Sequence, residues 1–171
     1  LLQRTQTKKV RATLSQEYWS IGTSEQVTRG DIAALLMAEL MLESRLEFTS
    51  RVAIISDITT HWAKPHIIKA VRYGIMQLPP DRFFRPNEPI RKGELAFVLD
   101  TLFNKLFRPL PEGSSVSFSD VHPDNDYHNA VLRVYSAGLM TASTEDSFGV
   151  LETISGEEVM QIFEKVKAMI R

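Results

Sequence analysis

The stretch ISDITTHWAKPHIIKAVRYGIM, residues 55–76, together with FFRPNEPIRKGELAFVLDTLFNKL, residues 83–106, decides the fold of this chain. The first part places apolar residues at the spacing of a short helix that ends at Gly74, a residue type that readily closes a helix. The second part interrupts the chain at Pro86 and Pro89 and then begins a longer helical pattern. The stretch therefore predicts a unit made of a helix, a proline-bearing loop and a second helix.

Parts of this unit recur on both sides of it. VTRGDIAALLMAEL begins at Val27 and ISGEEVMQIFEKV begins at Ile154, and both match the segment that begins at Ile90. The first half of the unit recurs once, as FSDVHPDNDYHNAVLRVYSAGLM at residues 118–140. Self-similarity at a fixed period indicates tandem units. We expect three, forming one compact domain, at residues 1–49, 50–112 and 113–171.

The first unit departs most from the pattern. Residues 1–13 show no Asp turn, no Trp and no glycine stop, so the unit is degenerate or partial: either it begins upstream or its first half has decayed. We expect a loop at residues 14–26 and a long helix from Val27 to about Arg45. No strand is firmly indicated, and residues 51–55 and 116–118 are candidates for brief extended pieces that are too short for a sheet of their own.

Three residues in the cap position differ between the long helices. Thr28 and Ser155 each precede an acidic residue by three positions, which is the spacing of a capping box. The corresponding residue of the second unit is Arg91, so Glu94 is expected to lack its usual capping partner.

The composition excludes several classes of protein. Hydrophobic residues make up 43% of the 171 residues, which is enough for a domain with its own core. A net charge of −1 does not point to nucleic acid, and no apolar run is long enough for membrane insertion. The absence of cysteine excludes disulfides and thiolate metal sites. Because the chain begins at Leu1 rather than Met, we expect it to be a piece of a longer protein.

The motifs of the second unit resemble those of the S-layer homology family. ISD at 55–57, HWA at 61–63, YGI at 73–75, FRPNEPI at 84–90 and RKGE at 91–94 follow the family pattern. The third unit retains FSDV and ISGEE, and the first retains VTRGD, so the resemblance covers about residues 14–170.

The resemblance implies an all-α fold, in which three helix-loop-helix repeats form a pseudo-threefold bundle. It also implies a non-catalytic anchoring module of the bacterial cell envelope or cell surface, outside the cytoplasm, without cofactors. Grooves between neighbouring units would bind cell-wall polysaccharide, either an anionic secondary polymer or peptidoglycan. The alternative is a degenerate domain that has lost glycan binding and assembles with other envelope proteins.

The main candidates for glycan contact are Arg29 and Lys92, the residues just inside two of the long helices. A cation at a helix N-terminus opposes the macrodipole at a cost of about 0.3–1 kcal/mol, and an anionic ligand held by the cation and the free N–H groups would offset that cost. An exposed side chain of trivial cost is the other interpretation. The third unit has Gly156 at this position, so at most two grooves are expected to be competent on this criterion.

Three further residues complete the predicted glycan site. Asp57 and Asp120 could accept hydrogen bonds from sugar hydroxyls, although an Asp in a turn more often caps its own backbone. Trp62 could offer a flat face to a sugar ring, although core packing is the more frequent role of such a residue. Tyr127 occupies a position near that of the Trp in the third unit.

No catalytic residue and no metal site is predicted. Residues 120–128 contain two His and three Asp, but they do not match the spacing of a calcium-binding loop. Nucleophile elbows and phosphate loops are missing from the sequence. A wall hydrolase would need two carboxylates facing a cleft, which is a question of geometry.

Overall fold

A computed structural model describes residues 14–50, 54–113 and 116–171, and the regular structure in these ranges is helical. The α-helices and the 3₁₀-helices, marked η, are α2 (Gln16–Ser20), η1 (Ile21–Thr23), α3 (Arg29–Leu40), η2 (Leu42–Ser44), α4 (Lys64–Arg72), α5 (Lys92–Lys105), α6 (His128–Ser136) and α7 (Gly156–Ile170). Extended structure in the described ranges is limited to isolated antiparallel bridges, Thr28 with Pro89 and Arg91 with Thr153. The expected all-α class is confirmed.

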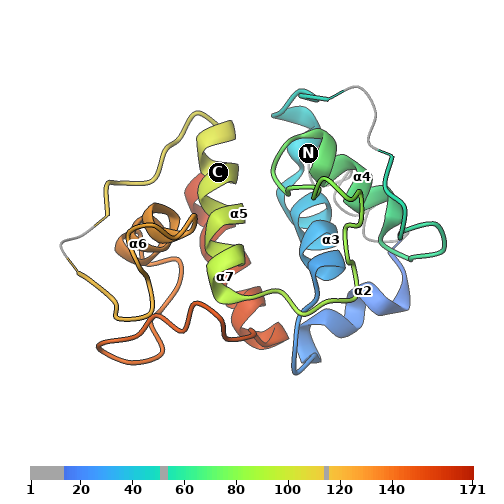
Figure 1. Cartoon of the computed structure of the whole chain (residues 1–171). Helices are drawn as coiled ribbons and strands as arrows, with labels where there is room; N and C mark the ends of the chain where they lie inside the picture. The colour runs from blue at the N-terminus through green and yellow to red at the C-terminus, as the bar shows by residue number, and fades with distance from the viewer. Residues whose placement is uncertain (1–13, 51–53, 114–115) are drawn as a thin grey trace.

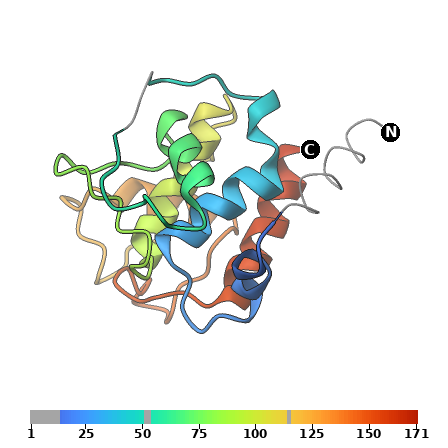
Figure 2. The ribbon, with the colours of Figure 1, turned by 90° about the vertical axis from the view of Figure 1, so that its right-hand side faces the viewer.

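The three long helices α3, α5 and α7 run through the middle of the molecule (Figures 1 and 2). Helix α4 packs on the outer side of α3, and α6 packs on the outer side of α5 (Figure 1). Helix α7 contacts α3 and also η1, which is far from it in the sequence.

A continuous apolar core joins these helices. Ile32, Leu95 and Val159, which occupy corresponding positions in the three repeated segments, are all completely buried. Burial of one such side chain stabilises a fold by about 1.5–3 kcal/mol. The repeated register in the sequence therefore corresponds to one shared core.

Two expectations near the N-terminal part of the chain are wrong. Helix α3 ends at Leu40 rather than near Arg45, because Met41 adopts left-handed backbone (φ 49°) and η2 follows. The expected loop at residues 14–26 contains α2 and η1. Tyr18 and Ile21 are buried and lie on these short helices.

The glycine stops are confirmed. Gly74 and Gly138 follow α4 and α6 with φ of 68° and 69°, a conformation that costs glycine little. Residues 54–55 and 116–118 form no strand, in agreement with the expectation that no strand is firmly indicated, and residues 51–53 lie outside the described residues, as do residues 1–13.

The first residues of α3 dock on the loop that precedes α5. Arg29 N donates to Glu88 O at 3.0 Å, and Gly30 N donates to Pro86 O at 2.9 Å. Free N–H groups at a helix start need such acceptors. The loop therefore satisfies the donors of a helix from another part of the chain.

The starts of α5 and α7 are satisfied in the same manner. Lys92 N donates to Glu152 O at 2.9 Å, and Gly156 N donates to Ser24 O at 2.8 Å. The loop that satisfies α7 thus lies beside η1, near the start of the described chain. The unit boundaries at 1–49, 50–112 and 113–171 and the pseudo-threefold bundle stay predictions.

Candidate glycan-binding site

Arg29 is held by several partners at the start of α3. Its Nε donates to Phe84 O at 2.7 Å, its guanidinium lies 4.7 Å from the centre of the Phe84 ring, and Nη2 donates to Gln77 O at 3.3 Å. Nη1 forms an ion pair with Glu94, and 13% of the Arg29 side chain is exposed. Burial lowers the pKa of Arg29, opposed by the nearby Glu88. Arg29 is therefore a mostly buried cation rather than a free surface arginine.

The partner of Arg29 follows from the unusual cap of α5. Thr28 and Ser155 form capping boxes with Asp31 and Glu158, as expected. Arg91 makes no cap bond with its side chain, and the Nη1 atom of Arg91 instead donates to Leu151 O at 3.1 Å. Glu94, at the position that closes the box in the other two helices, turns to Arg29.

A surface cavity of about 240 Å³ opens beside Arg29. Its other lining residues include Pro79, Arg85, Glu88, Arg91 and Glu94. Pockets for drug-sized ligands usually measure about 300–1,000 Å³. This cavity can therefore hold a carboxylate or part of a sugar, while the rest of a polymer would lie outside it.

Lys92 occupies the corresponding place at the start of α5. Its Nζ donates to Ser143 Oγ at 2.9 Å and lies 5.0 Å from the centre of the Phe148 ring. The residue is 6% exposed, and burial lowers the pKa of Lys92 although Glu152, Glu158 and Asp120 act in the opposite direction. The adjoining cavity measures only about 60 Å³, so the Lys92 site is more closed than the Arg29 site.

Close packing explains why the start of α7 has a glycine, Gly156, where α3 and α5 have a cation. A Cβ atom on this residue would lie 1.8 Å from Ile21 O, so the backbone beside η1 fills the space that a cation would need. The close packing of α7 on η1 therefore leaves no room for a third cation at this position.

Asp57 and Asp120 bind backbone rather than standing free. Asp57 accepts hydrogen bonds from Phe84 N at 2.8 Å and Arg85 N at 2.6 Å. Asp120 accepts from three successive N–H groups, those of residues 148–150, at 2.7–2.8 Å. These loops lie 27–30 residues further along the chain, so each carboxylate caps a distant loop and not its own turn.

The protonation of Asp120 reflects these contacts. Burial alone would raise its pKa, but the hydrogen bonds from the backbone N–H groups outweigh burial and hold the pKa of Asp120 below its ordinary value. A carboxylate with such contacts is stabilised in its charged form. The negative charge of Asp120 therefore interacts with the backbone of residues 148–150.

The aromatic candidates are partly buried. Trp62 packs against the core and stacks on His61, with ring centres 5.9 Å apart. His61 Nε2 lies 3.1 Å from Asn87 Oδ1, and its Nδ1 accepts from Ala63 N at 3.1 Å. Tyr127 packs against the core and meets Phe97 edge to face. The five predicted glycan contacts do not converge on one cleft, and only Arg29 lines the cavity described above.

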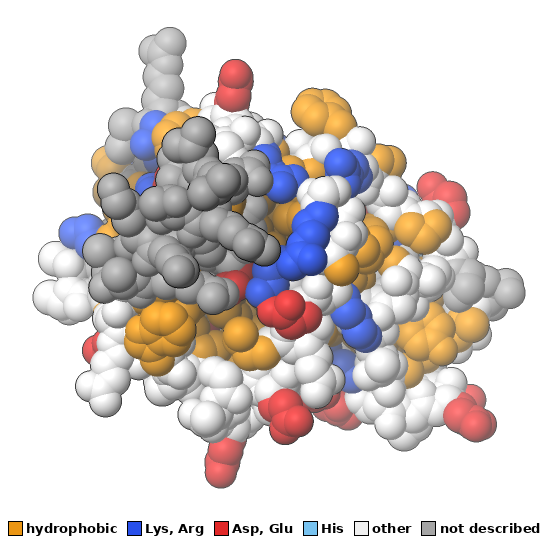
Figure 3. Space-filling model, turned by 180° about the vertical axis from the view of Figure 1, so that it is seen from behind, with side chains coloured by type: hydrophobic (Ala, Val, Ile, Leu, Met, Phe, Trp, Pro, Cys, Tyr) orange, Lys and Arg blue, Asp and Glu red, His pale blue; other side chains and the backbone are white. Residues whose placement is uncertain are grey.

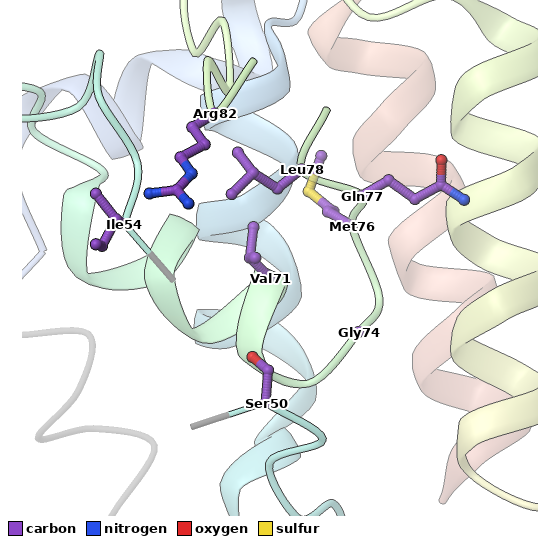
Figure 4. A pocket seen from close by; sticks show the side chains of 8 residues that line it. All are labelled: Ser50, Ile54, Val71, Gly74, Met76, Gln77, Leu78 and Arg82. Carbon is purple, nitrogen blue, oxygen red and sulfur yellow. The ribbon is translucent and has the colours of Figure 1, made fainter. Parts of the chain in front are cut away.

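A second cavity, of about 530 Å³, is lined in part by Gln77, whose carbonyl oxygen accepts from Arg29, and by Val71 of α4 (Figure 4). Its lining is mainly apolar, and the Arg82 side chain points over Leu78 and Val71 (Figure 4). Gln77 points away from them, toward α5 (Figure 4). Within the described ranges, no set of three or more His, Cys, Asp or Glu side chains is placed to hold a metal ion.

Sequence reasoning missed the groups that surround the cations. Phe84 and Phe148 were not identified from the sequence as rings beside Arg29 and Lys92. The repeated placement of a phenylalanine six positions before Ile90 and Ile154 is the signal that could have indicated them. The role of Ser143 has no comparable signal in the sequence.

Comparison with known families supports the resemblance in the central unit. Residues 54–96 match the family model of the S-layer homology domain. These residues form an S-layer homology domain. The matched segment contains the His-Trp-Ala motif, the proline-bearing loop and the start of α5 with Lys92.

The matched family indicates a general role for this segment. An S-layer homology domain is a cell-surface anchoring module, and such domains typically bind cell-wall polymers. No curated protein matches the chain. None of the helices in the described part combines the length and the apolarity that a membrane span requires.

Proposed function

We propose that the chain anchors a protein to the bacterial cell envelope by binding an anionic cell-wall glycan, without catalysing a reaction. The observation that carries the proposal is the arginine-lined cavity beside Arg29, at the junction of α3 with the S-layer homology segment 54–96. The three repeated units and their pseudo-threefold bundle are part of the proposal. They are supported by the similar docking of the starts of α3, α5 and α7.

The chemistry of the cavity suits an acidic group. Arg29, Arg85 and Arg91 line it, and the ion pair with Glu94 already places a carboxylate on Arg29. Arginine binds carboxylates well because its planar group offers several donors in a fixed geometry. A carboxylate or pyruvate group of the polymer would compete with Glu94 for Arg29.

The wider surface also favours an anionic polymer. Lys and Arg side chains form a diagonal band across the face seen from behind (Figure 3). This band exists although the chain carries a net charge of −1. A local band of positive charge can attract an extended anion without a strong overall field.

The inference of a non-catalytic role rests on the carboxylates. Asp57 and Asp120 both accept backbone N–H groups, so both carboxylates already have partners within the fold. Glycoside hydrolysis requires one carboxyl group that can donate a proton to the leaving oxygen. Neither Asp is placed for that role.

Co-sedimentation with purified sacculi tests the proposal. The chain should sediment with sacculi, and acid extraction of the secondary polymer should abolish the binding if that polymer is the ligand. Binding that survives extraction assigns peptidoglycan as the ligand. Absence of binding to both preparations would refute the glycan-binding proposal.

Variants at the cavity then test the residue assignment. Arg29→Gln should weaken sedimentation by about tenfold, the typical effect of removing one charge-assisted contact. Lys64→Gln, at an exposed lysine of α4 outside the cavity, is the matched control. Because Arg29 is mostly buried, each variant must first show a wild-type circular dichroism spectrum. A folded Arg29→Gln variant that sediments like wild type would remove Arg29 from the site.

A degenerate interaction module is the second candidate. Arg29 and Lys92 already have internal partners, and the space at Gly156 is filled by backbone. Exposed apolar side chains such as Leu151, which is 75% exposed, could contact another envelope protein. Lack of affinity for sacculi together with a specific complex formed with a second envelope protein would favour this function.

A further inference from the structure

A further cavity lies at the opposite end of the central helices. It measures about 730 Å³ and opens beyond the C-terminal ends of α3 and α5. Helix α5 has 14 residues, so this cavity lies roughly 20 Å from the start of that helix at a rise of 1.5 Å per residue. It is therefore separate from the cavity beside Arg29. The ends of both helices point to the same edge of the molecule, at the top of Figure 1.

The cavity carries an excess of positive charge. Arg45 and Lys105 line it, against the single carboxylate of Glu47. Arg45 Nη1 donates to Ile170 O at 2.6 Å, which anchors the guanidinium at the end of α7 and leaves its other donors for a ligand. Cations near helix C-termini are favoured by the macrodipole. The macrodipole therefore accounts for two cations near these helix ends, but it does not account for the cavity that they line.

Lys105 is half-buried without an ionic partner. Its Nζ lies 3.1 Å from the point that a Cβ atom on Gly74 would occupy, so the glycine gives the ammonium group room beside the backbone. In the described part of the chain, Lys105 makes no hydrogen bond or ion pair. Half-buried ammonium groups usually have a partner, because three donors are otherwise left partly desolvated. The cavity supplies the space for one.

Neutral polar groups stand beside the cations. Tyr73, Thr101 and Asn104 line the cavity, and the Tyr73 hydroxyl has no partner among the described residues. Burial raises the pKa of Tyr73, so its hydroxyl remains protonated and can donate. The Asn104 amide donates to Asp100 O at 3.0 Å, which leaves its carbonyl oxygen as an acceptor. These groups match the alternating donors and acceptors of sugar hydroxyls.

An aromatic ring stands at the mouth of the cavity. Phe107 lines it, is 93% exposed and adopts left-handed backbone with φ 55°. This conformation is unfavourable for a bulky residue, and exposure of a whole phenyl ring gains nothing for the fold. A ring in this position can pack against the C–H face of a pyranose.

We infer that this cavity is a second carbohydrate subsite, which takes an acidic sugar through Arg45, Lys105, Tyr73 and Phe107. The acid group would contact the two cations, the hydroxyls would contact Tyr73 and Asn104, and the sugar ring would pack on Phe107. The inference rests on the proposed function in that the acidic sugar would belong to the same wall polymer. A polymer that reached both cavities would be held at opposite ends of the central helices.

Titration of the folded chain with D-glucuronate, followed by nuclear magnetic resonance, tests the subsite. Backbone signals of Gly74 and Lys105 should shift and saturate. D-glucose, which lacks the charge, should bind about tenfold more weakly, as expected for the loss of a charge-assisted contact. Inorganic phosphate, which lacks the sugar ring, should also bind more weakly than glucuronate.

Two conservative variants locate the contacts. Lys105→Gln should weaken glucuronate binding about tenfold, and Tyr73→Phe should weaken it severalfold while the ring keeps its stacking on Phe48. Lys64→Gln, near the other end of α4, should bind like wild type. Unchanged binding by Lys105→Gln would overturn the inference, as would the absence of saturable shifts in wild type. Phosphate binding as tight as that of glucuronate would overturn the sugar specificity.

This test is independent of the proposed site beside Arg29. Arg29→Gln should reduce sedimentation with sacculi and leave the glucuronate shifts at Gly74 unchanged. Wild-type protein that binds glucuronate but does not sediment with sacculi would contradict the wall-binding proposal without removing the subsite. The opposite result would remove the subsite alone.

Discussion

Replacement of Arg91 by threonine should stabilise the domain and release Arg29. Arg91 is the N-cap of α5, and its backbone angles (φ −93°, ψ 151°) nearly equal those of Thr28 at the start of α3 (φ −92°, ψ 167°). Threonine therefore fits this position without strain. Its hydroxyl would accept the N–H group of Glu94, and the Glu94 carboxylate would accept the N–H group of residue 91, as Asp31 does for Thr28.

The expected magnitude comes from comparison with alanine at the same position. Both Arg91→Thr and Arg91→Ala lose the bond from Nη1 to Leu151 O, so their difference reports the cap, reduced by the cost of leaving Arg29 without its ion pair if Glu94 moves. A threonine N-cap exceeds alanine by about 1 kcal/mol, within a range of about 0.5–2 kcal/mol. For a domain of this size, about 1 kcal/mol corresponds to about 2–4 °C in the melting temperature.

Chemical and thermal denaturation measure this difference directly. The Thr variant should show a higher denaturation midpoint than the Ala variant with the same denaturant slope. If Glu94 moves to the cap, Arg29 loses its ion pair, and the Thr variant should also bind sacculi more tightly than the Ala variant. Equal midpoints together with equal binding to sacculi would refute the reasoning, because they would mean that the threonine neither caps α5 nor draws Glu94 away from Arg29.

Three further outcomes follow from the geometry. Gly156→Ala should destabilise the domain by about 3 kcal/mol or more, because its Cβ would meet Ile21 O; denaturant melts check this. Gly138→Ala should cost only about 1–2 kcal/mol, because nothing lies within 4 Å and only the left-handed backbone is strained; equal losses in the two variants would contradict the steric argument. Asp120→Asn should cost about 2–3 kcal/mol at pH 7, since a charged acceptor of three N–H groups is lost. Because the folded pKa of Asp120 is depressed, its contribution is fully present above its unfolded pKa and is lost as pH falls through the folded pKa, so the stability difference between wild type and Asp120→Asn should begin to narrow only below about pH 4 and should disappear once the pH is below the folded pKa.

The repeated apolar register made the helices predictable. Ile32, Leu95 and Val159 keep one spacing relative to the start of their helices, and a buried face with that period has few alternatives to an α-helix. The glycines that end α4 and α6 were equally predictable from the sequence. Helix α2 was missed because five residues are too few for a periodic signal, and Met41 gives no warning that α3 ends there.

The candidate site was less predictable because its contacts are long-range. The sequence indicated that Arg91 breaks the capping pattern and isolates Glu94. It could not indicate that Glu94 would form an ion pair with Arg29, which is 65 positions earlier in the chain and on another helix. The burial of Lys92 likewise depends on Ser143 and Phe148, residues whose position is set by the packing of a distant loop. Spacing within a helix predicts neighbours on that helix and not partners across the fold.

The contact between α7 and η1 has a consequence for the way the domain unfolds. In open repeat arrays each repeat touches only its neighbours, so the outermost repeats can fray while the middle stays folded. Here Val27 N also donates to Ile154 O at 2.9 Å, so the region before α3 and the region before α7 are directly joined. Neither region can melt alone without exposing the apolar surface of the other. The molecule should therefore lose its structure in one cooperative step, with calorimetric and van't Hoff enthalpies that agree.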